Sequence, residues 1–155
     1  MMTLPHRSLI GLILLGIGGL AAVSGWNLNT RHHIATMLNV EKLPQSISVV
    51  DCASFGVTDV LERCSFQISA DDFPKLLSGY EFQVNQNCDV GKNGFCVNTA
   101  DAGTAHDYCC GPKLGDNFDI ATTYIATPRD APHGGSLTIL TDTEKRRVMI
   151  DLYIE

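Results

Sequence analysis

The densest group of side chains able to do chemistry is the run His106-Asp107-Tyr108-Cys109-Cys110. Imidazole and thiolate groups together suit zinc or copper, and a later loop supplies a further histidine. A tetrahedral site usually shows paired ligands such as Cys-x-x-Cys, which this chain lacks, and a cysteine in a disulfide cannot bind a metal. We therefore expect disulfides, surface histidines and no cofactor, and the weak metal candidates are His106, Cys109, Cys110 and His133.

The chain contains six cysteines, an even number that in an exported domain predicts disulfides. Cys88 and Cys96 flank the tight-turn dipeptide Asn93-Gly94, so we expect a local bridge between them. The last two cysteines are neighbours, a spacing that rarely meets disulfide geometry, so one or both are expected to reach back to the first two. The pairing of the remaining four stays open; they are Cys52, Cys64, Cys109 and Cys110.

No other motif predicts a catalytic activity, and we expect no enzyme. The sequence contains no nucleophile elbow, P-loop, dinucleotide fingerprint or His-Glu-x-x-His. Residues 85–91 superficially resemble a calcium loop, but the glycine comes one position late and Cys96 stands where the bidentate acid belongs. The basic run Lys145-Arg146-Arg147 is typical of a solvated hairpin turn that discourages edge pairing, with a docking contact as the alternative.

The elements that position these residues begin with a long uncharged run, Ser8–Trp26. At 1.5 Å per residue, a helix of this length nearly crosses a bilayer core of about 30 Å. Arg7 and the small residues that end the run also suit a cleaved signal peptide, but the length of the run and an interfacial Trp26 favour a retained transmembrane helix. Small residues at helical spacing predict a face that packs against another helix in lipid; they are Ser8, Gly11, Gly18, Ala22 and Gly25.

The charge of the chain is concentrated behind this run. All 17 acidic side chains but only nine of the 11 lysines and arginines lie in residues 34–155, which leaves a formal charge of −8 there. An acidic domain argues against nucleic acid as a partner. Because disulfides need oxidising surroundings, we expect a single-pass membrane protein with a cytoplasmic amino terminus and a periplasmic or otherwise extracytoplasmic carboxyl-terminal domain.

The residues after the membrane segment predict a small α+β domain. Phe73, Leu76 and Leu77 follow a helical period, with Gly79 able to end the helix. Residues 85–115 predict a loop stapled by disulfides. Alternating or β-branched stretches predict an antiparallel sheet of five or six strands with one or two short helices, the strands being Ile47–Phe55, Arg63–Ser69, Tyr80–Val84, Asn117–Thr127, Ser136–Thr141 and Arg147–Ile154.

Four segments follow from these patterns. Residues 1–7 form a cytoplasmic lead, residues 8–26 the transmembrane helix or uncleaved signal anchor, residues 27–46 a connector, and residues 47–155 the extracytoplasmic domain. The connector includes a short helical stretch with apolar residues on one face.

These patterns favour a membrane-anchored accessory or structural subunit. Its helix would pack against other transmembrane subunits, and its domain would cap or brace a larger membrane complex. A periplasmic binding module of the inhibitor or immunity type is the second hypothesis. The plan of an apolar helix carrying a disulfide-bearing α+β domain also resembles a pilin or pseudopilin, which implies a filament subunit. This chain lacks the pilin processing site, in which a glycine precedes the apolar run and a glutamate occupies its fifth position.

Overall fold

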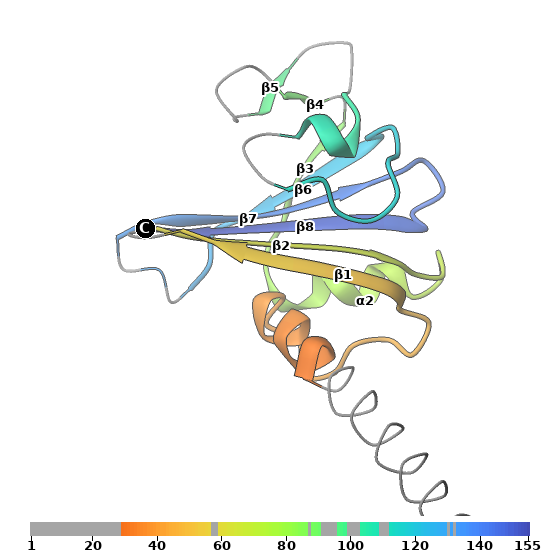
Figure 1. Ribbon diagram of the computed structural model, residues 1–155, viewed down its shortest axis with the longest axis horizontal. Helices are drawn as coiled ribbons and strands as arrows, with labels where there is room; N and C mark the ends of the chain where they lie inside the picture. Colours follow the sequence, from red (N-terminus) through yellow and green to blue (C-terminus); the bar gives the residue numbers. More distant parts are fainter. Residues whose placement is uncertain are drawn as a thin grey trace, which may run out of the picture.

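The computed structural model describes residues 29–56, 59–86, 88–90, 96–98, 103–108, 112–129, 131 and 133–155. Within them, six strands form one antiparallel sheet in the order β1-β2-β8-β7-β6-β3 (Figure 1). A separate two-stranded sheet consists of β4 and β5, which come between β3 and β6 in the chain. The bounds are β1 Ser48–Phe55, β2 Val60–Gln67, β3 Gln83–Gln86, β4 Cys88–Val90, β5 Cys96–Asn98, β6 Thr122–Ala126, β7 Gly135–Thr141 and β8 Arg147–Ile154.

The large sheet has apolar side chains on both faces. Because side chains alternate along a strand, Val148, Ile150 and Leu152 of β8 point to one face, and Met149 and Asp151 point to the other. The first face is packed under helices and is called the helix face here. The second is packed under residues 103–108 and 112–120, called the covering loop, and is called the loop face. Figure 1 shows these two layers on opposite sides of the sheet.

The helix face is covered by a helix over residues 29–37, by α2 (Phe73–Leu76) and by the 3₁₀ helix η1 (Leu77–Gly79). Ile34 and Leu38 lie one helical turn apart and are fully buried against the sheet, so the first helix belongs to the core. A Schellman cap follows the helix. Asn39 has a φ of 52°, and the backbone N–H groups of Asn39 and Val40 donate hydrogen bonds to carbonyl groups of the last helical turn.

The two helical pieces are fixed to each other at Gly79. The Asn39 side-chain amide donates to the Gly79 carbonyl over 2.9 Å. A Cβ at Gly79 would lie 1.9 Å from the carbonyl oxygen of Leu38, so only glycine permits this approach. Sequence analysis expects Gly79 to end a helix, and the structure shows that it is needed for close packing.

The loop face has its own smaller core. Leu140 and Met149 of the sheet pack under Tyr108, Phe118 and Ile120 of the covering loop. The loop contains the 3₁₀ helix η2 (Ala105–Asp107), and its two ends are joined by an antiparallel bridge between Thr104 and Asp119. The sheet is therefore buried on both faces.

The expected fold class, an α+β domain behind a transmembrane helix, is wrong. Strands dominate, because the helix expected from Phe73, Leu76 and Leu77 contracts to four α-helical residues and one 3₁₀ turn, and the expected loop at 85–115 contains β4 and β5. Among the described residues, no helix is both long enough and apolar enough to cross a membrane. Ser8–Trp26 lies outside the described residues. The expected antiparallel sheet is confirmed, with six strands.

Candidate functional site

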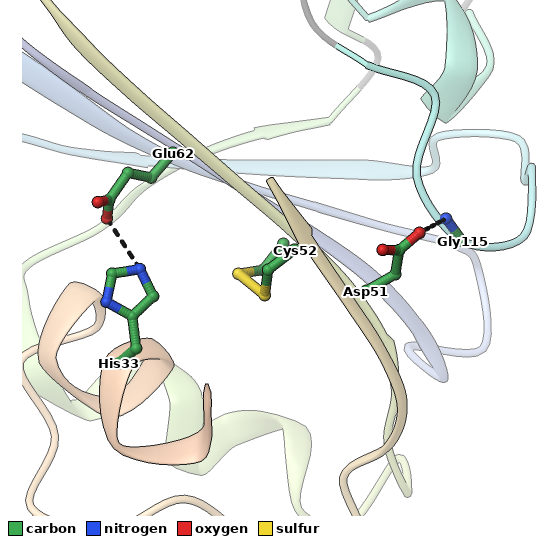
Figure 2. The surroundings of a disulfide bond; sticks show 6 residues. His33, Asp51, Cys52, Glu62 and Gly115 are labelled. Atoms are coloured by element: carbon green, nitrogen blue, oxygen red, sulfur yellow. Dashed lines mark hydrogen bonds and ion pairs between the residues drawn. A yellow bond between two sulfur atoms is a disulfide. The ribbon is translucent and has the colours of Figure 1, made fainter. Parts of the chain in front are cut away.

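A disulfide between Cys52 and Cys64 ties the edge strand β1 to β2 (Figure 2). The two residues lie directly opposite each other in the antiparallel register, with their Cα atoms 4.1 Å apart. The Cys64 side chain is buried in the core under the helix face, and Cys52 packs against it. The expectation that Cys109 or Cys110 reaches back to Cys52 or Cys64 is therefore wrong, whereas the prediction that the domain contains a disulfide is confirmed.

The disulfide also tells which backbone groups of β1 point outward. A short Cα–Cα distance marks a non-hydrogen-bonded pair, whose backbone N–H and C=O groups point away from the partner strand. Cys52, and Ser54 two residues later, therefore direct their backbone groups to the outer edge of the sheet. Within the described residues, no other segment makes a backbone hydrogen bond to this edge.

The same strand contains a strained valine at its start. The register between β1 and β2 shifts between Ser48 and Asp51, and Val49 in this bulge has a φ of 51°. A β-branched residue in the left-handed region costs about 1–2 kcal/mol. The Val49 side chain is 61% exposed, so its packing against the described residues offsets little of that conformational free energy. Such strain is typical of positions kept for function.

The exposed charges of the β1–β2 hairpin are all negative. Between Ser48 and Gln67 the charged residues are Asp51, Asp59, Glu62 and Arg63, and the arginine is 1% exposed. Figure 2 shows how two of the carboxylates lie on opposite sides of the disulfide. Asp51 accepts a hydrogen bond from the Gly115 backbone N–H over 3.2 Å, and Glu62 lies 3.1 Å from His33 Nε2.

Arg63 is the centre of a buried polar cluster on the loop face. Its guanidinium donates to Asp151 Oδ2 and, over 3.4 Å each, to the carbonyl oxygens of Tyr108 and Pro112. It also lies 5.6 Å from the centre of the Tyr108 ring. Thr138 lies directly opposite Asp151 in the register and hydrogen-bonds Tyr108. The cluster fastens the covering loop to the sheet.

Burial controls the ionisation of this cluster. It raises the pKa of the Asp151 carboxyl, and the neighbouring Arg63 charge offsets only part of that effect. Burial likewise raises the pKa of the Tyr108 hydroxyl, although its hydrogen bond with Thr138 acts in the opposite direction. Arg63, Asp151 and Tyr108 are each at most 8% exposed, so a substrate has no access to them and the cluster is structural.

An open groove of about 930 Å³ lies where β2 ends and the β7–β8 turn begins. Two ion pairs join four of the charged residues that line it. Asp142 accepts a hydrogen bond from Arg147 Nε over 2.9 Å, and Glu144 lies 3.5 Å from Arg146 Nε. Burial acts to raise the pKa of Asp142, but hydrogen bonds from the Arg147 side chain and from two backbone N–H groups outweigh it and lower that pKa.

The basic run at the same turn is occupied with contacts inside the domain. Lys145 Nζ lies 5.7 Å from the centre of the Phe73 ring, and the Arg147 guanidinium lies 5.6 Å from that of Phe118. The hypothesis of a docking contact at 145–147 therefore gains no support from the geometry.

The weak metal candidates do not form a ligand set among the described residues, where no group of three or more His, Cys, Asp or Glu side chains is placed to hold a metal. His106 Nε2 lies 3.2 Å from the Gly115 carbonyl oxygen, and the His106 backbone N–H donates to the Asn117 side chain. His133 lies exposed in the loop before β7. Cys109 and Cys110 lie outside the described residues.

The predicted Cys88–Cys96 bridge stays a prediction, because only the backbone of these two residues is described. In the β4–β5 register Cys88 lies opposite Asn98, and Cys96 lies opposite Val90. The two cysteines are therefore diagonal neighbours on one face of that pair. The packing role predicted for the small-residue stripe also stays a prediction, since its members lie outside the described residues; they are Ser8, Gly11, Gly18, Ala22 and Gly25.

Sequence reasoning missed the residues that define this site. Val49 and Ser54 read as ordinary strand residues, because neither a bulge nor an edge position has a clear signature in one sequence. Comparison of the chain with protein-family models, with curated proteins and with solved structures finds no match.

Proposed function

We propose that this domain works outside the cytoplasm as an accessory domain that binds another protein through the outer edge of β1. The observation that carries this proposal is Val49, a valine that is strained in its backbone and exposed in its side chain. A stable fold has no need of such a residue, whereas a partner that covers Val49 would bury its apolar surface. Burying a valine contributes about 1.5–3 kcal/mol to an interface.

The surroundings of the edge support a binding role rather than a catalytic one. Arg63 and Asp151 on the loop face are buried, and the two arginines that line the groove are paired with carboxylates. The Cys52–Cys64 disulfide supports an oxidising compartment, because such bonds are rare in proteins of reducing compartments. The disulfide also holds β1 in place, so little ordering entropy would be lost on binding.

The test compares two valines that are exposed to a similar degree. Val49→Asn removes the apolar side chain, and asparagine tolerates the left-handed backbone of the bulge. The control is Val84→Asn on β3 at the opposite edge, where valine is 57% exposed and outside any bulge. The full chain and both variants are isolated after chemical crosslinking in the cells that produce them, and crosslinked proteins are quantified by mass spectrometry.

We expect Val49→Asn to reduce the amount of a specific crosslinked partner by at least about nine-tenths. This tenfold reduction corresponds to a loss of about 1.4 kcal/mol of binding free energy. The midpoint temperature of thermal unfolding of this variant should equal or exceed that of the parent chain, because the backbone strain at residue 49 is relieved. Val84→Asn should keep the partner. Equal recovery of the same partners with Val49→Asn and with the parent chain would refute a binding role for this edge.

A further inference from the structure

We infer that β1 takes up an extended, basic segment of its partner as an additional strand of the large sheet. This inference rests on the proposed function and specifies both the mode of binding and the chemistry of the bound segment. Strand addition of this kind gains its affinity from backbone hydrogen bonds and its specificity from alternate side chains.

The backbone of β1 offers the pairing groups that strand addition needs. Cys52 and Ser54 each present one N–H and one C=O at the outer edge, because their partners across β2 form non-hydrogen-bonded pairs. From Asp51 to Phe55 the register with β2 is regular, so this part of the edge is straight enough to pair. The bulge at Val49 ends the regular part.

Beyond the bulge at Val49, the edge has few of the features that usually prevent pairing. Exposed edge strands of natural proteins carry lysine or proline, or are covered by a helix or a loop. Ser48–Phe55 contains neither residue type, and within the described residues its outer edge is uncovered. The disulfide keeps the strand extended without occupying its outer backbone groups.

The negative charge of the hairpin favours a basic segment as the added strand. The exposed charged side chains of the hairpin are Asp51 and Asp59; Glu62 is half-buried beside His33, and the only cation between Ser48 and Gln67 is the buried Arg63. A partner strand paired with β1 and carrying lysine or arginine at alternate positions on the loop face would bring positive charges alongside Asp51, the one charged residue of β1 itself. A second copy of this chain would instead bring the same negative charges together, within a domain of charge −8.

The experiment uses the oxidised full chain and a synthetic probe, the fluorescein-labelled peptide Thr-Lys-Val-Lys-Val-Lys-Thr with blocked ends. A second peptide carries glutamate in place of each lysine. A third carries N-methyl groups on alternate backbone amides, which removes the donors along one side of the strand. Binding is measured by fluorescence anisotropy at two salt concentrations, and self-association by sedimentation.

Two variants at one position isolate the backbone contribution. Ser54→Pro removes the outward N–H at a place where proline is tolerated in edge strands, and Ser54→Ala changes the side chain while keeping that N–H. We expect Ser54→Pro to weaken binding of the lysine peptide at least about tenfold, equivalent to one or two hydrogen bonds, and Ser54→Ala to change it less than about twofold. The N-methylated peptide should lose affinity to the same extent, and this arm needs no protein variant to fold.

Several results would overturn the inference. They are no binding of the lysine peptide up to about 1 mM, equal binding of the glutamate peptide, and binding that neither Ser54→Pro nor N-methylation weakens. Self-association of the parent chain that Ser54→Pro abolishes would assign the edge to a second copy. If the crosslinked partner is lost in Val49→Asn while the peptide arms fail, the binding function stands and only strand addition is wrong.

Discussion

Replacing Asp151 with leucine should lower the free energy of unfolding by about 3–5 kcal/mol, because it leaves the Arg63 guanidinium charged and without its carboxylate in the interior. The size of the effect follows from burial, since the side chains of Arg63 and Asp151 are 1% and 8% exposed. An arginine side chain stays charged in proteins, so it cannot escape this cost by becoming neutral.

The reciprocal change should cost less and should depend on pH. In Arg63→Met the Asp151 carboxyl can take up a proton, and burial already raises its pKa in the folded parent protein. A carboxyl whose folded pKa exceeds its unfolded value binds more protons when folded. The stability of Arg63→Met should therefore rise as the pH falls through the folded pKa of Asp151, and level off below its unfolded pKa of about 3.9.

The double variant Arg63→Met/Asp151→Leu removes both charges and should lose less stability than the sum of the single variants. We expect a coupling free energy of about 2–3 kcal/mol from urea unfolding of the oxidised chain at pH 7. The matched control is Arg147→Met, whose partner is Asp142 but whose side chain is 44% exposed, and which should cost less than about 1 kcal/mol. Additive single effects, within about 0.5 kcal/mol, would refute the assignment of a buried coupled pair.

Two further predictions concern other fixed points of the fold. Replacing both Cys52 and Cys64 with alanine should lower the free energy of unfolding by about 3 kcal/mol, since the disulfide spans a sequence separation of 12. It should also speed hydrogen exchange of the Asp51 and Ala53 amides, which point toward β2. Unchanged exchange at these amides would contradict the role of the disulfide. Gly79→Ala should lower the free energy of unfolding, measured by thermal unfolding, by about 2–3 kcal/mol. The control is Gly103→Ala, whose Cβ would meet nothing within 4 Å and which should cost less than about 1 kcal/mol. Equal losses in the two variants would rule out the close approach of Gly79 to Leu38.

The strands that sequence analysis placed best are those with strict alternation. The hairpin was expected at Ser136–Thr141 and Arg147–Ile154, and β7 and β8 have nearly these bounds. Leu137 and Ile139 of β7 and Val148, Ile150 and Leu152 of β8 alternate along their strands, so a shift of one residue would move this whole apolar set from the helix face to the loop face. The prediction at Tyr80–Val84 was displaced to Gln83–Gln86, because β3 pairs with β6 through contacts about 40 residues away in sequence, which local alternation does not reveal.

The disulfide of β1 had a signature in the sequence that was not used. Cys52 and Cys64 lie at equal distances from the centre of a β1–β2 hairpin, so a turn around residues 56–60 would have predicted their pairing. Sequence analysis instead predicts bridges from these cysteines to Cys109 or Cys110. Register, which spacing alone does not fix, decided the pairing.

The burial of Arg63 and Asp151 was not predictable from their own strands. Both alternate with apolar residues in the manner of a solvent-facing side, and only the covering loop makes that side an interior. Leu140 and Met149 on the same face were the available indication, because apolar residues there need a second layer to cover them.

These features together support the proposal that the outer edge of β1 binds a partner. The helix face is fixed by Asn39 and Gly79, and the loop face is fixed by Arg63, so both layers over the sheet are held by specific contacts. The disulfide then prevents β1 from fraying while its outward backbone groups stay available. Association with a strand already held extended costs less ordering entropy than association with a flexible one. Reduction of the disulfide should therefore weaken binding at this edge even where the rest of the sheet stays folded.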